Sequence, residues 1–538
     1  MKIIKDPIYG YIEIHEEYLS LINTPYFQRL RDILQTSYTS LYPASLQNRF
    51  THSLGVFHLG QIALESLLSK LKKNYSKYFN NNQEEIKKCS YTFNLACLLH
   101  DVGHAPFSHT GEDFFLEKEI WQTLIDELNC ESFSADAKSD LPQGAPHEIM
   151  SALIALKYLS KYFNPELVDK ELFTRCIIGL KYKATSSLNS IKNCLIEMLH
   201  SDTIDVDRLD YLIRDSFMSG YCSVDIYYKR LLSSIQLNLD NDLFELTYTK
   251  NALSVLENFI IAHDSEKKWI QAHPSILYES CLIGGMIKFA ISLYHEKDIY
   301  LLSEDALSEN GIGTGEYHIK LLSDSDIFSI VKKYGYDEEC VKSYFDRSLR
   351  RKTFWKSESE YKVLFEKKFS PLKGGNLTKI EDYFDSLNNL LNFNNIPIIN
   401  DKAIEELKKQ LEEAKDPAVT EVGQFGGGRE GVLTKTIYLF TQLKKLCNKH
   451  KCDLDFIIIS ARQFKSGFNK EKFQNTKIWF PNLNKSDELD KAINVLSNDQ
   501  SREKFFYIYA PEQNRNRIGC YELLNVIADF SQKYLEKK

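Results

Sequence analysis

The chain has 538 residues, of which 43% are apolar and 26% are charged, as in an average globular protein. This composition excludes a disordered chain, a collagen-like fibre and a small disulfide scaffold. The formal net charge of −7 argues against a general nucleic-acid coat, which would be basic, but it allows a local basic pocket for a polyanion. No apolar run approaches the roughly 18 residues of a spanning helix. Residues 1–7 lack the apolar core of a signal peptide, so we expect a cytoplasmic protein without a membrane partner.

The first 300 residues are predicted to be mostly helical, because Gly and Pro are sparse and apolar residues recur at helical spacing. Helices are expected at residues 51–71 and 191–213. A third is expected at 91–99, where nearly every residue is apolar, and it would end before Gly103.

The amino-acid composition changes after residue 300. Residues 320–420 carry many Lys and Glu and still favour helices, notably at 403–414. Pro417 and the glycine-rich residues 423–431 predict a loop or linker.

The last 100 residues mix two periodicities. Residues 454–459 and 505–509 are typical of strands, and residues 521–534 of a closing helix. The sequence therefore predicts a helical body followed by a smaller α+β lobe.

The densest polar cluster is HDVGHAPFSH at residues 100–109, directly after an apolar helix. Buried His and Asp side chains need partners, and a metal ion is one of them. Imidazole nitrogen with carboxylate oxygen suits Fe, Mn, Zn or Mg. Because two ligands do not hold a catalytic metal, further ligands are expected from elsewhere in the chain.

Two other segments offer such ligands. Residues 49–53, RFTHS, contain His52, and residues 200–211 contain four aspartates among apolar residues. By itself, the aspartate segment also fits helix capping and surface charge. Together with the two histidine segments, it favours a metal site.

The order His … His-Asp … Asp resembles the signature of the HD phosphohydrolase superfamily. The similarity extends to the catalytic core of the vertebrate dNTP triphosphohydrolases that carry a sterile alpha motif, and to bacterial dGTPase-like enzymes. It covers residues 1–290 and, more weakly, 450–510, and it places the start of this chain at the catalytic core, without a sterile alpha motif domain. The matching blocks occur in the same order and are residues 2–15, 24–31, 48–56, 100–109 and 204–215.

This resemblance implies a fold class and a domain plan. The fold would be mainly α, with an HD-domain helical catalytic core over residues 1–300. A helical extension would follow over 301–420, and a smaller C-terminal α+β lobe over 421–538.

The resemblance also implies a divalent metal cofactor, Mg²⁺, Mn²⁺, Fe²⁺ or Zn²⁺, and a set of catalytic residues. The metal ligands would be His52, His100, Asp101 and Asp207. His109 would be the general acid, and Glu112, which replaces the family's Asp, would orient it. His104 and His147 would neutralise the α-phosphate, or else support the other groups by hydrogen bonds.

By the same resemblance, Arg49, Arg208 and Tyr211 would contact phosphate, and Gln35 and Asp215 would read the sugar 3′-hydroxyl. For Asp215, an ordinary surface salt bridge is the alternative. Two departures affect the sugar pocket. Thr36 replaces a Leu of the vertebrate enzymes, and the gate region, residues 263–273, lacks a clear gate tyrosine, although Gln271 matches a neighbouring Gln.

The activator site of the family is also altered. Lys2, Gln28 and Arg31 match nucleotide-contacting residues, whereas Asn23 replaces an Asp and Lys5 replaces an Asn. The resemblance implies a homo-oligomer, a tetramer, with an activating nucleotide that need not be GTP.

We therefore expect a metal-dependent dNTP triphosphohydrolase that yields deoxynucleoside and tripolyphosphate. One alternative is an HD-type phosphodiesterase or nuclease that acts on single-stranded nucleic acid or on a nucleotide signal. Another is a nucleotide-sensing interaction protein with vestigial catalysis. An exposed basic groove would favour the nuclease, and ligand-dependent assembly without turnover would favour the sensor.

Overall fold

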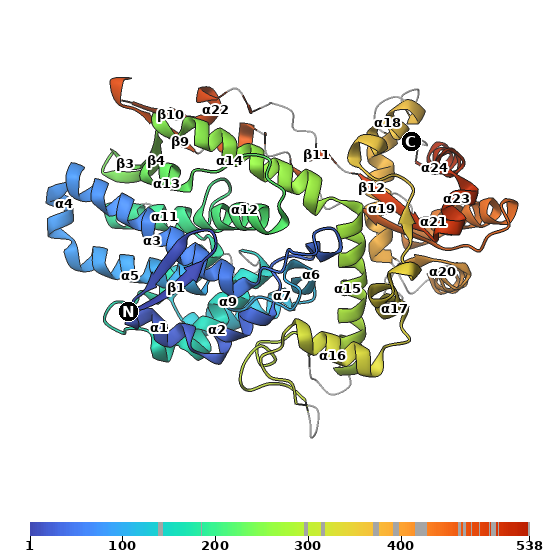
Figure 1. Ribbon diagram of the computed structural model, residues 1–538, viewed down its shortest axis with the longest axis horizontal. Helices are drawn as coiled ribbons and strands as arrows, with labels where there is room; N and C mark the ends of the chain where they lie inside the picture. The colour runs from blue at the N-terminus through green and yellow to red at the C-terminus, as the bar shows by residue number, and fades with distance from the viewer. Residues whose placement is uncertain are drawn as a thin grey trace. The chain divides into compact units, whose positions relative to one another are not determined.

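The structure is a computed structural model whose contacts divide the described chain into two compact units (Figure 1). The first unit comprises Met1–Lys267, Ala290–Ile330 and Ser466–Gln500, and the second comprises Lys268–Phe289, Val331–Lys465 and Ser501–Lys538. The structure describes the whole chain except residues 138–143, 184–185, 295–299, 314–317, 370–375, 391–396, 415–427, 461–463, 466–467, 469, 475, 484, 494, 497–501, 504 and 536–538.

The first unit is organised around α3 (Arg49–Asn74), which packs on α5 (Gln83–Leu99) and α12 (Val206–Ser219). These helices confirm the expected helices at 51–71 and 91–99 and the mainly α fold. The other helices of this unit are α1 (Glu16–Ile22), α2 (Pro25–Arg29), α4 (Ser76–Asn81), α6 (His109–Glu112), α7 (Glu117–Leu128), α8 (Glu131–Asp136), α9 (Pro146–Ile154), α10 (Lys170–Ile178), α11 (Ser187–Leu199), α13 (Tyr228–Ser233), α14 (Leu253–Glu266) and the short α22 (Leu489–Ala492).

The single helix expected at 191–213 is wrong, because the chain forms α11 and α12 with a break between them. Asp205 causes the break: its side chain accepts the backbone N–H of Arg208 at 2.7 Å and so caps the start of α12. Asn48 caps α3 in the same way, with its side chain 3.1 Å from the Thr51 N–H. The two caps place His52 and Asp207 in the first turns of their helices.

Two sheets belong to the first unit, and the sequence analysis predicted neither. The hairpin of β1 (Lys2–Asp6) and β2 (Gly10–Ile14) pairs Lys2 with Ile14. The other sheet has the order β10-β9-β4-β3, in which β4 and β9 run parallel. Its strands are β3 (Ile235–Asp240), β4 (Leu243–Thr249), β9 (Lys477–Phe480) and β10 (Lys485–Glu488).

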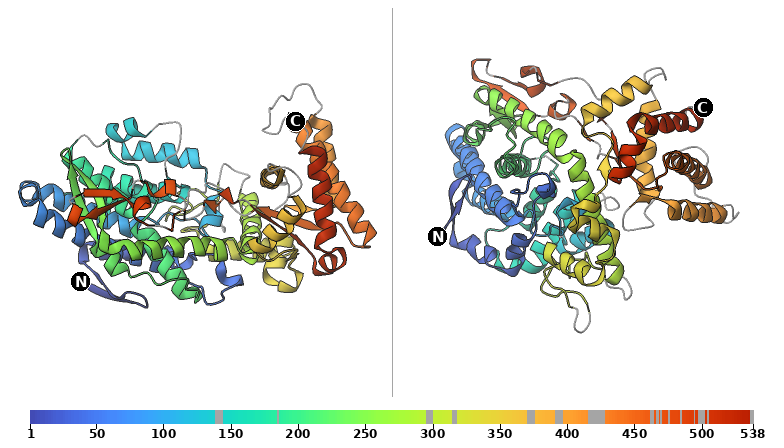
Figure 2. Two further views of the ribbon diagram at one scale, coloured as in Figure 1. Left: turned by 90° about the horizontal axis from the view of Figure 1, so that it is seen from above. Right: turned by 45° about the vertical axis from the view of Figure 1, so that its right-hand side comes forward.

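The second unit contains an antiparallel sheet of order β5-β12-β7-β6, covered by helices. The strands expected at 454–459 and 505–509 are confirmed as β7 (Phe456–Ser460) and β12 (Phe506–Ala510), and the closing helix as α24 (Cys520–Tyr534). α24 packs beside α21 (Gly428–Lys449) (Figure 2). The remaining elements are α17 (Glu339–Phe345), α18 (Glu358–Phe369), α19 (Asn376–Leu390), α20 (Asp401–Ala414), α23 (Glu512–Ile518), β5 (Lys352–Thr353), β6 (Ile398–Ile399) and the pair β8 (Phe464–Lys465) and β11 (Arg502–Glu503).

The boundaries of the two units differ from the linear plan of 1–300, 301–420 and 421–538. Residues 466–500 join the first unit because β9 pairs with β4, with Thr247 opposite Lys477. The loop expected at 423–431 is wrong from residue 428 onward, where α21 begins. Pro417 and residues 423–427 lie outside the described residues.

Two helices contain residues of both units. α15 (Pro274–Tyr294) begins in the second unit and ends in the first, and α16 (Asp324–Tyr334) begins in the first and ends in the second. By length and composition alone, α15 could span a membrane, but half of its most apolar window is buried inside the protein. A single helix of this kind is weak evidence for a span, since a helix in a protein core meets the same criteria.

The close approach of α3 and α12 depends on Gly55, and this gives a first prediction. A Cβ at Gly55 would overlap Asp210 Oδ1 and lie 2.5 Å from Arg214 Nη2. We expect Gly55→Ala to destabilise the protein by about 1–3 kcal/mol, as overpacked cores do. Thermal unfolding followed by circular dichroism measures the change.

Gly284→Ala in α15 is the matched control, because nothing lies within 4 Å of a Cβ there. This variant should be neutral or slightly more stable than the parent. Equal unfolding temperatures for Gly55→Ala and the parent would contradict the tight helix contact.

Candidate active site

The four predicted metal ligands lie together in the first unit. His52 comes from α3, His100 and Asp101 directly follow α5, and Asp207 comes from the first turn of α12. His52 Nε2 lies 2.9 Å from Asp207 Oδ1, 3.3 Å from His100 Nε2 and 3.7 Å from Asp101 Oδ2. The blocks that are far apart in sequence thus bring two imidazoles and two carboxylates to one point.

Hydrogen bonds behind the two rings fix which nitrogen faces the cluster. Asp210 Oδ2 accepts from His52 Nδ1 at 2.7 Å, and the carbonyl of Cys97 accepts from His100 Nδ1 at 3.0 Å. Because a carbonyl oxygen can only accept, Nδ1 of His100 must carry the proton. Both Nε2 atoms are therefore the ones turned toward the cluster, in the arrangement that metal-ligating histidines adopt.

The carboxylates of this cluster carry negative charge that a cation can balance. Burial alone would raise the pKa of Asp207 and lower that of His52. Their mutual hydrogen bond and neighbouring charges reverse both effects, so the pKa of Asp207 lies well below its usual range and that of His52 is raised to about 9. A proton on His52 then offsets the carboxylates. A divalent metal fits the same position, since two imidazole nitrogens and two carboxylate oxygens are a donor set for Fe, Mn, Zn or Mg.

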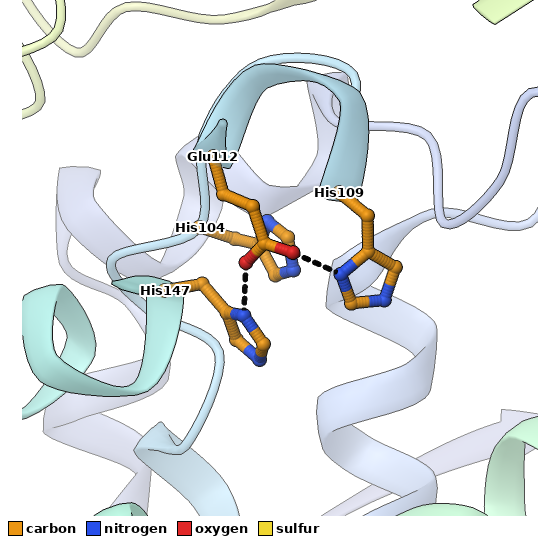
Figure 3. Close-up of side chains that lie close together, drawn as sticks. All are labelled: His104, His109, Glu112 and His147. Carbon is orange, nitrogen blue, oxygen red and sulfur yellow. Dashed lines mark hydrogen bonds and ion pairs between the residues drawn. The ribbon is translucent and has the colours of Figure 1, made fainter. Parts of the chain in front are cut away.

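The four predicted catalytic residues form a second cluster. Glu112 Oε1 accepts from His109 Nδ1 at 2.6 Å, and Glu112 Oε2 contacts His147 Nδ1 (Figure 3). The ring of His104 stacks on that of His147, with centroids 4.5 Å apart. His109 lies at the start of α6 and His147 in the first turn of α9, so one carboxylate joins two imidazoles from separate helices.

The shared carboxylate controls the protonation of this cluster. Burial opposes charge on both partners, but the pKa of Glu112 is lowered well below its usual range by His147 and His109. In turn, Glu112 raises the pKa of His147 from 6.5 to about 9. His147 is therefore a cation at neutral pH and can attract a negatively charged ligand.

His104 has the opposite character. It is fully buried, and among the described residues neither of its ring nitrogens has a hydrogen-bond partner. Burial lowers its pKa well below 6.5, and the nearby charges of Arg49 and His147 lower it further. A neutral imidazole with both nitrogens unpaired is costly unless a ligand pairs with them.

Arg49 connects the two clusters. Its Nη1 lies 2.8 Å from Asp101 Oδ2, and its Nε lies 2.9 Å from Ser108 Oγ. The guanidinium is 4% exposed, so its charge acts in a medium of low polarity. Asp101 and the loop that carries His109 are thereby held in fixed relation.

The residues predicted to read the sugar form a third group. Asp215 is buried and accepts from Gln47 Nε2 at 2.7 Å, and the backbone of Gln47 pairs with that of Gln35. Burial raises the pKa of Asp215 to about 6. Gln35 Oε1 is buried without a partner among the described residues, which leaves an acceptor for a ligand hydroxyl. The surface salt bridge considered for Asp215 is wrong, because this side chain is 2% exposed.

Arg208 and Tyr211 lie further along α12. The Arg208 guanidinium contacts the Asp205 carboxylate and the Ser201 carbonyl, so it would have to leave this cap to bind phosphate. Burial raises the pKa of Tyr211 well above 10. Gln271 belongs to the second unit, in a π-helical turn at Lys267–Gln271.

The structure brings together two of the three predicted activator residues. Arg31 Nε donates to Gln28 Oε1 at 2.7 Å, and the Arg31 guanidinium lies 3.6 Å from the Phe50 ring centroid. Lys2 lies on β1 and is exposed.

The sequence analysis missed the residues that hold the site in place. Asp210 was noted only as one of four aspartates, and Gln47, Ser108 and Tyr9 were not singled out at all. Tyr9 Oη donates to Asp210 Oδ1 at 2.7 Å, across 201 residues of sequence. The one available signal was the spacing of Asp207 and Asp210, which puts both carboxylates on adjacent turns of a helix.

Comparisons with known proteins find sequence relatives and a similar solved structure. No family model matches the chain. It is 38% identical over 238 residues to the deoxynucleoside triphosphate triphosphohydrolase SAMHD1 of Gallus gallus, covering 43% of this chain and 36% of that protein. It is 30% identical over 216 residues to a protein of Acanthamoeba polyphaga mimivirus named for its HD domain, covering 39% and 41%.

The chain spans about half the length of the curated relatives it matches. A hypothetical protein from Aquifex aeolicus has a similar solved structure, with a TM-score of 0.53 and 19% identity over 96% of this chain and 99% of that one. This likeness shows the fold alone. The resemblance to HD-domain dNTP triphosphohydrolases is confirmed by the sequence relatives. Together with the His/Asp cluster, they support the general class of HD-type metal-dependent hydrolases.

The shared carboxylate gives a second prediction. Without the charge of Glu112, the pKa of the buried His147 should fall from about 9, because burial lowers it and Glu112 is the largest cause that raises it. In the parent, the ion pair of His147 and Glu112 contributes to the free energy of unfolding. This contribution is fully present below pH 6.5 and is lost as the pH rises through about 9, where His147 loses its proton. NMR titration of protein carrying ¹³C-labelled histidine, parent against Glu112→Gln, measures the shift.

Glu148→Gln is the matched control. Glu148 pairs with His200, with His200 Nδ1 at 3.0 Å, so this variant should lower the pKa of His200. It should lower the pKa of His147 less than Glu112→Gln does, because Glu148 is a smaller cause of the His147 shift than Glu112. An unchanged His147 titration in Glu112→Gln would refute the assigned role of the shared carboxylate.

Proposed function

We propose that the protein is a dNTP triphosphohydrolase that cleaves at the α-phosphate and releases deoxynucleoside and tripolyphosphate. The observation that carries this proposal is the pairing of two clusters through Arg49: a His/Asp cluster fit for a metal and a Glu-linked histidine cluster beside it. The former provides sites for a divalent cation, and the latter provides cationic and proton-donating groups. Both kinds of group assist the cleavage of a phosphate ester bond.

Metal chemistry enters through His52, His100, Asp101 and Asp207. When bound there, a divalent cation supplies Lewis-acid activation of a phosphoryl oxygen and of water. The ring hydrogen bonds of His52 to Asp210 and of His100 to Cys97 hold the ligands ready, so little reorganisation is needed on binding.

The histidine cluster binds and protonates the substrate. His147, kept cationic by Glu112, pairs with a phosphate oxygen, and the unpaired nitrogens of His104 offer a further hydrogen bond. His109 is 57% exposed on its side chain, and its Nδ1 is held by Glu112, so its Nε2 is the atom that gives a proton to the leaving 5′-oxygen. Glu112 fixes the orientation of the His109 ring.

The polar group of Gln35, Gln47 and Asp215 supports a nucleotide substrate with a free 3′-hydroxyl. A buried carboxylate and a buried amide oxygen without a partner can both accept from a sugar hydroxyl. A site built to pair with a hydroxyl rejects analogues that lack it by about 10⁴–10⁵-fold. We therefore expect 2′,3′-dideoxynucleotides to be poor substrates.

The third prediction tests this activity. Purified protein with Mn²⁺ or Mg²⁺ is given all four dNTPs and four NTPs, and chromatography resolves every product. Deoxynucleoside with tripolyphosphate is the expected result. His100→Ala and Asp101→Ala should lose activity by at least about 10³-fold and lose bound metal, measured by mass spectrometry of the metal content.

His15→Ala is the control, because His15 is exposed at the start of α1 and should leave activity unchanged. Pyrophosphate or inorganic phosphate as the only product would contradict cleavage at the α-phosphate. If no triphosphate is consumed and single-stranded DNA is cut instead, the HD-type nuclease replaces this proposal.

We also propose that the protein works as a homo-oligomer with an activating nucleotide. The support is the adjacency of Gln28 and Arg31 on a partly exposed face, in blocks similar to the activator site of the family. In this fourth prediction, mass photometry with and without nucleotides should show a larger assembly with nucleotide. Arg31→Glu should prevent the change, and a constant mass under all conditions would count against an activator.

A further inference from the structure

The loop that carries the catalytic histidines has a strained backbone. Phe107 and Ser108, between His104 and His109, have φ values of 58° and 53°. Such conformations are rare for residues other than glycine, and for Ser108 the ψ of −130° takes the backbone outside the left-handed helical region. A strained segment persists only where surrounding contacts hold it, so the contacts of this loop identify the groups responsible.

One contact to this loop comes from α16, which is far away in sequence. Asp324 Oδ1 accepts the N–H of Phe107 at 2.6 Å, and Asp324 Oδ2 accepts the N–H of Leu34 at 3.0 Å. The side chain is buried, with 4% exposed. One carboxylate therefore joins the strained loop to the segment that precedes Gln35.

Other contacts join the strained loop to the segment that contains Leu34. Ser108 Oγ donates to the Leu34 carbonyl at 2.5 Å and accepts from Arg49 Nε. One turn further along α16, the ring of Phe328 packs edge-on against Phe107, with centroids 5.1 Å apart. The helix thus contacts the loop through a carboxylate and an aromatic ring.

Arg29 ties the preceding part of the loop to the same helix. Its guanidinium donates to the carbonyls of Val102 and His104 at 3.0 and 2.8 Å, and to the carbonyl of Leu322 at 2.7 Å. Leu322 lies two residues before Asp324. The segment around residues 322–328 therefore supports the loop at both of its ends.

We propose that Asp324 is a positioning residue for the reaction: it holds the strained loop so that His104 and His109 face the substrate together with Gln35. This inference rests on the proposed function, and it gives a role to residues 322–328, whose sequence carries no catalytic motif. Asp324 acts through backbone N–H groups and does not itself touch the metal cluster or the histidine rings in the described contacts.

The fifth prediction uses Asp324→Asn, which keeps the size of the side chain. An amide can accept only one of the two N–H bonds and turns a donor toward the other. Hydrogen exchange followed by mass spectrometry should show faster exchange in peptides that cover residues 102–112. With dNTP, kcat should fall by about 10–100-fold while KM and metal content stay within about threefold of the parent, since misplacement affects the chemical step more than binding.

Asp326→Asn on the same helix is the matched control. Asp326 Oδ2 accepts from the N–H and Oγ of Ser323 and does not contact the loop, so this variant should leave exchange in residues 102–112 and kcat unchanged. Thermal unfolding of both variants measures any general loss of stability.

Two results would overturn the positioning role. One is parent-like exchange of residues 102–112 in Asp324→Asn. The other is a fall in kcat that Asp326→Asn reproduces at equal loss of stability. The exchange measurement needs no substrate, so a parent protein that hydrolyses no dNTP would contradict the proposed function and leave the test of Asp324 intact. In that case, bis(p-nitrophenyl) phosphate replaces dNTP in the kinetic measurement.

Discussion

The buried carboxylate of Asp210 is the constraint on which the rest of the site depends. It accepts from His52 on α3, from Arg214 on its own helix at 2.8 and 3.0 Å, and from Tyr9 in the N-terminal hairpin. A charge buried between helices must be paired, and losing one partner typically costs about 3–5 kcal/mol. This need brings α3, α12 and the hairpin together, and it fixes the ring of His52 toward the metal position.

The same principle organises the histidine cluster. Glu112 is stable as an anion because His109 and His147 surround it, and Glu112 in return raises the pKa of His147. Arg49 then joins this cluster to Asp101 through Ser108. The neutral ring of His104, whose nitrogens have no partner among the described residues, stacks on the cationic ring of His147. His147 can therefore attract an anion, and His104 can form a hydrogen bond with it.

Individual residues show how far the sequence could be interpreted. His52, His100, Asp101 and Asp207 were identified from short motifs in a fixed order that resembles the HD-domain family. The caps at Asn48 and Asp205 explain why His52 and Asp207 lie in the first turns of their helices. The break at residues 200–205 was missed, although this stretch is polar apart from Ile204, because apolar residues recur at helical spacing on both sides of it. The capping bond of Asp205 marks the start of the second helix. The β4–β9 pairing was missed because parallel strands 230 residues apart leave no local signal.

The sequence by itself determined the helical body, which follows from local periodicity. It also indicated the metal-ligand candidates and the histidines that accompany them, which follow from the resemblance of its motifs to those of the HD-domain family. Only the tertiary structure decided which groups support them. Tyr9 reaches Asp210, and Asp324 reaches Phe107, through contacts between segments that lie 201 and 217 residues apart. Such contacts form because buried charges and buried backbone N–H groups need partners in the folded chain. The residues next to them in sequence do not reveal which distant segment supplies the partner.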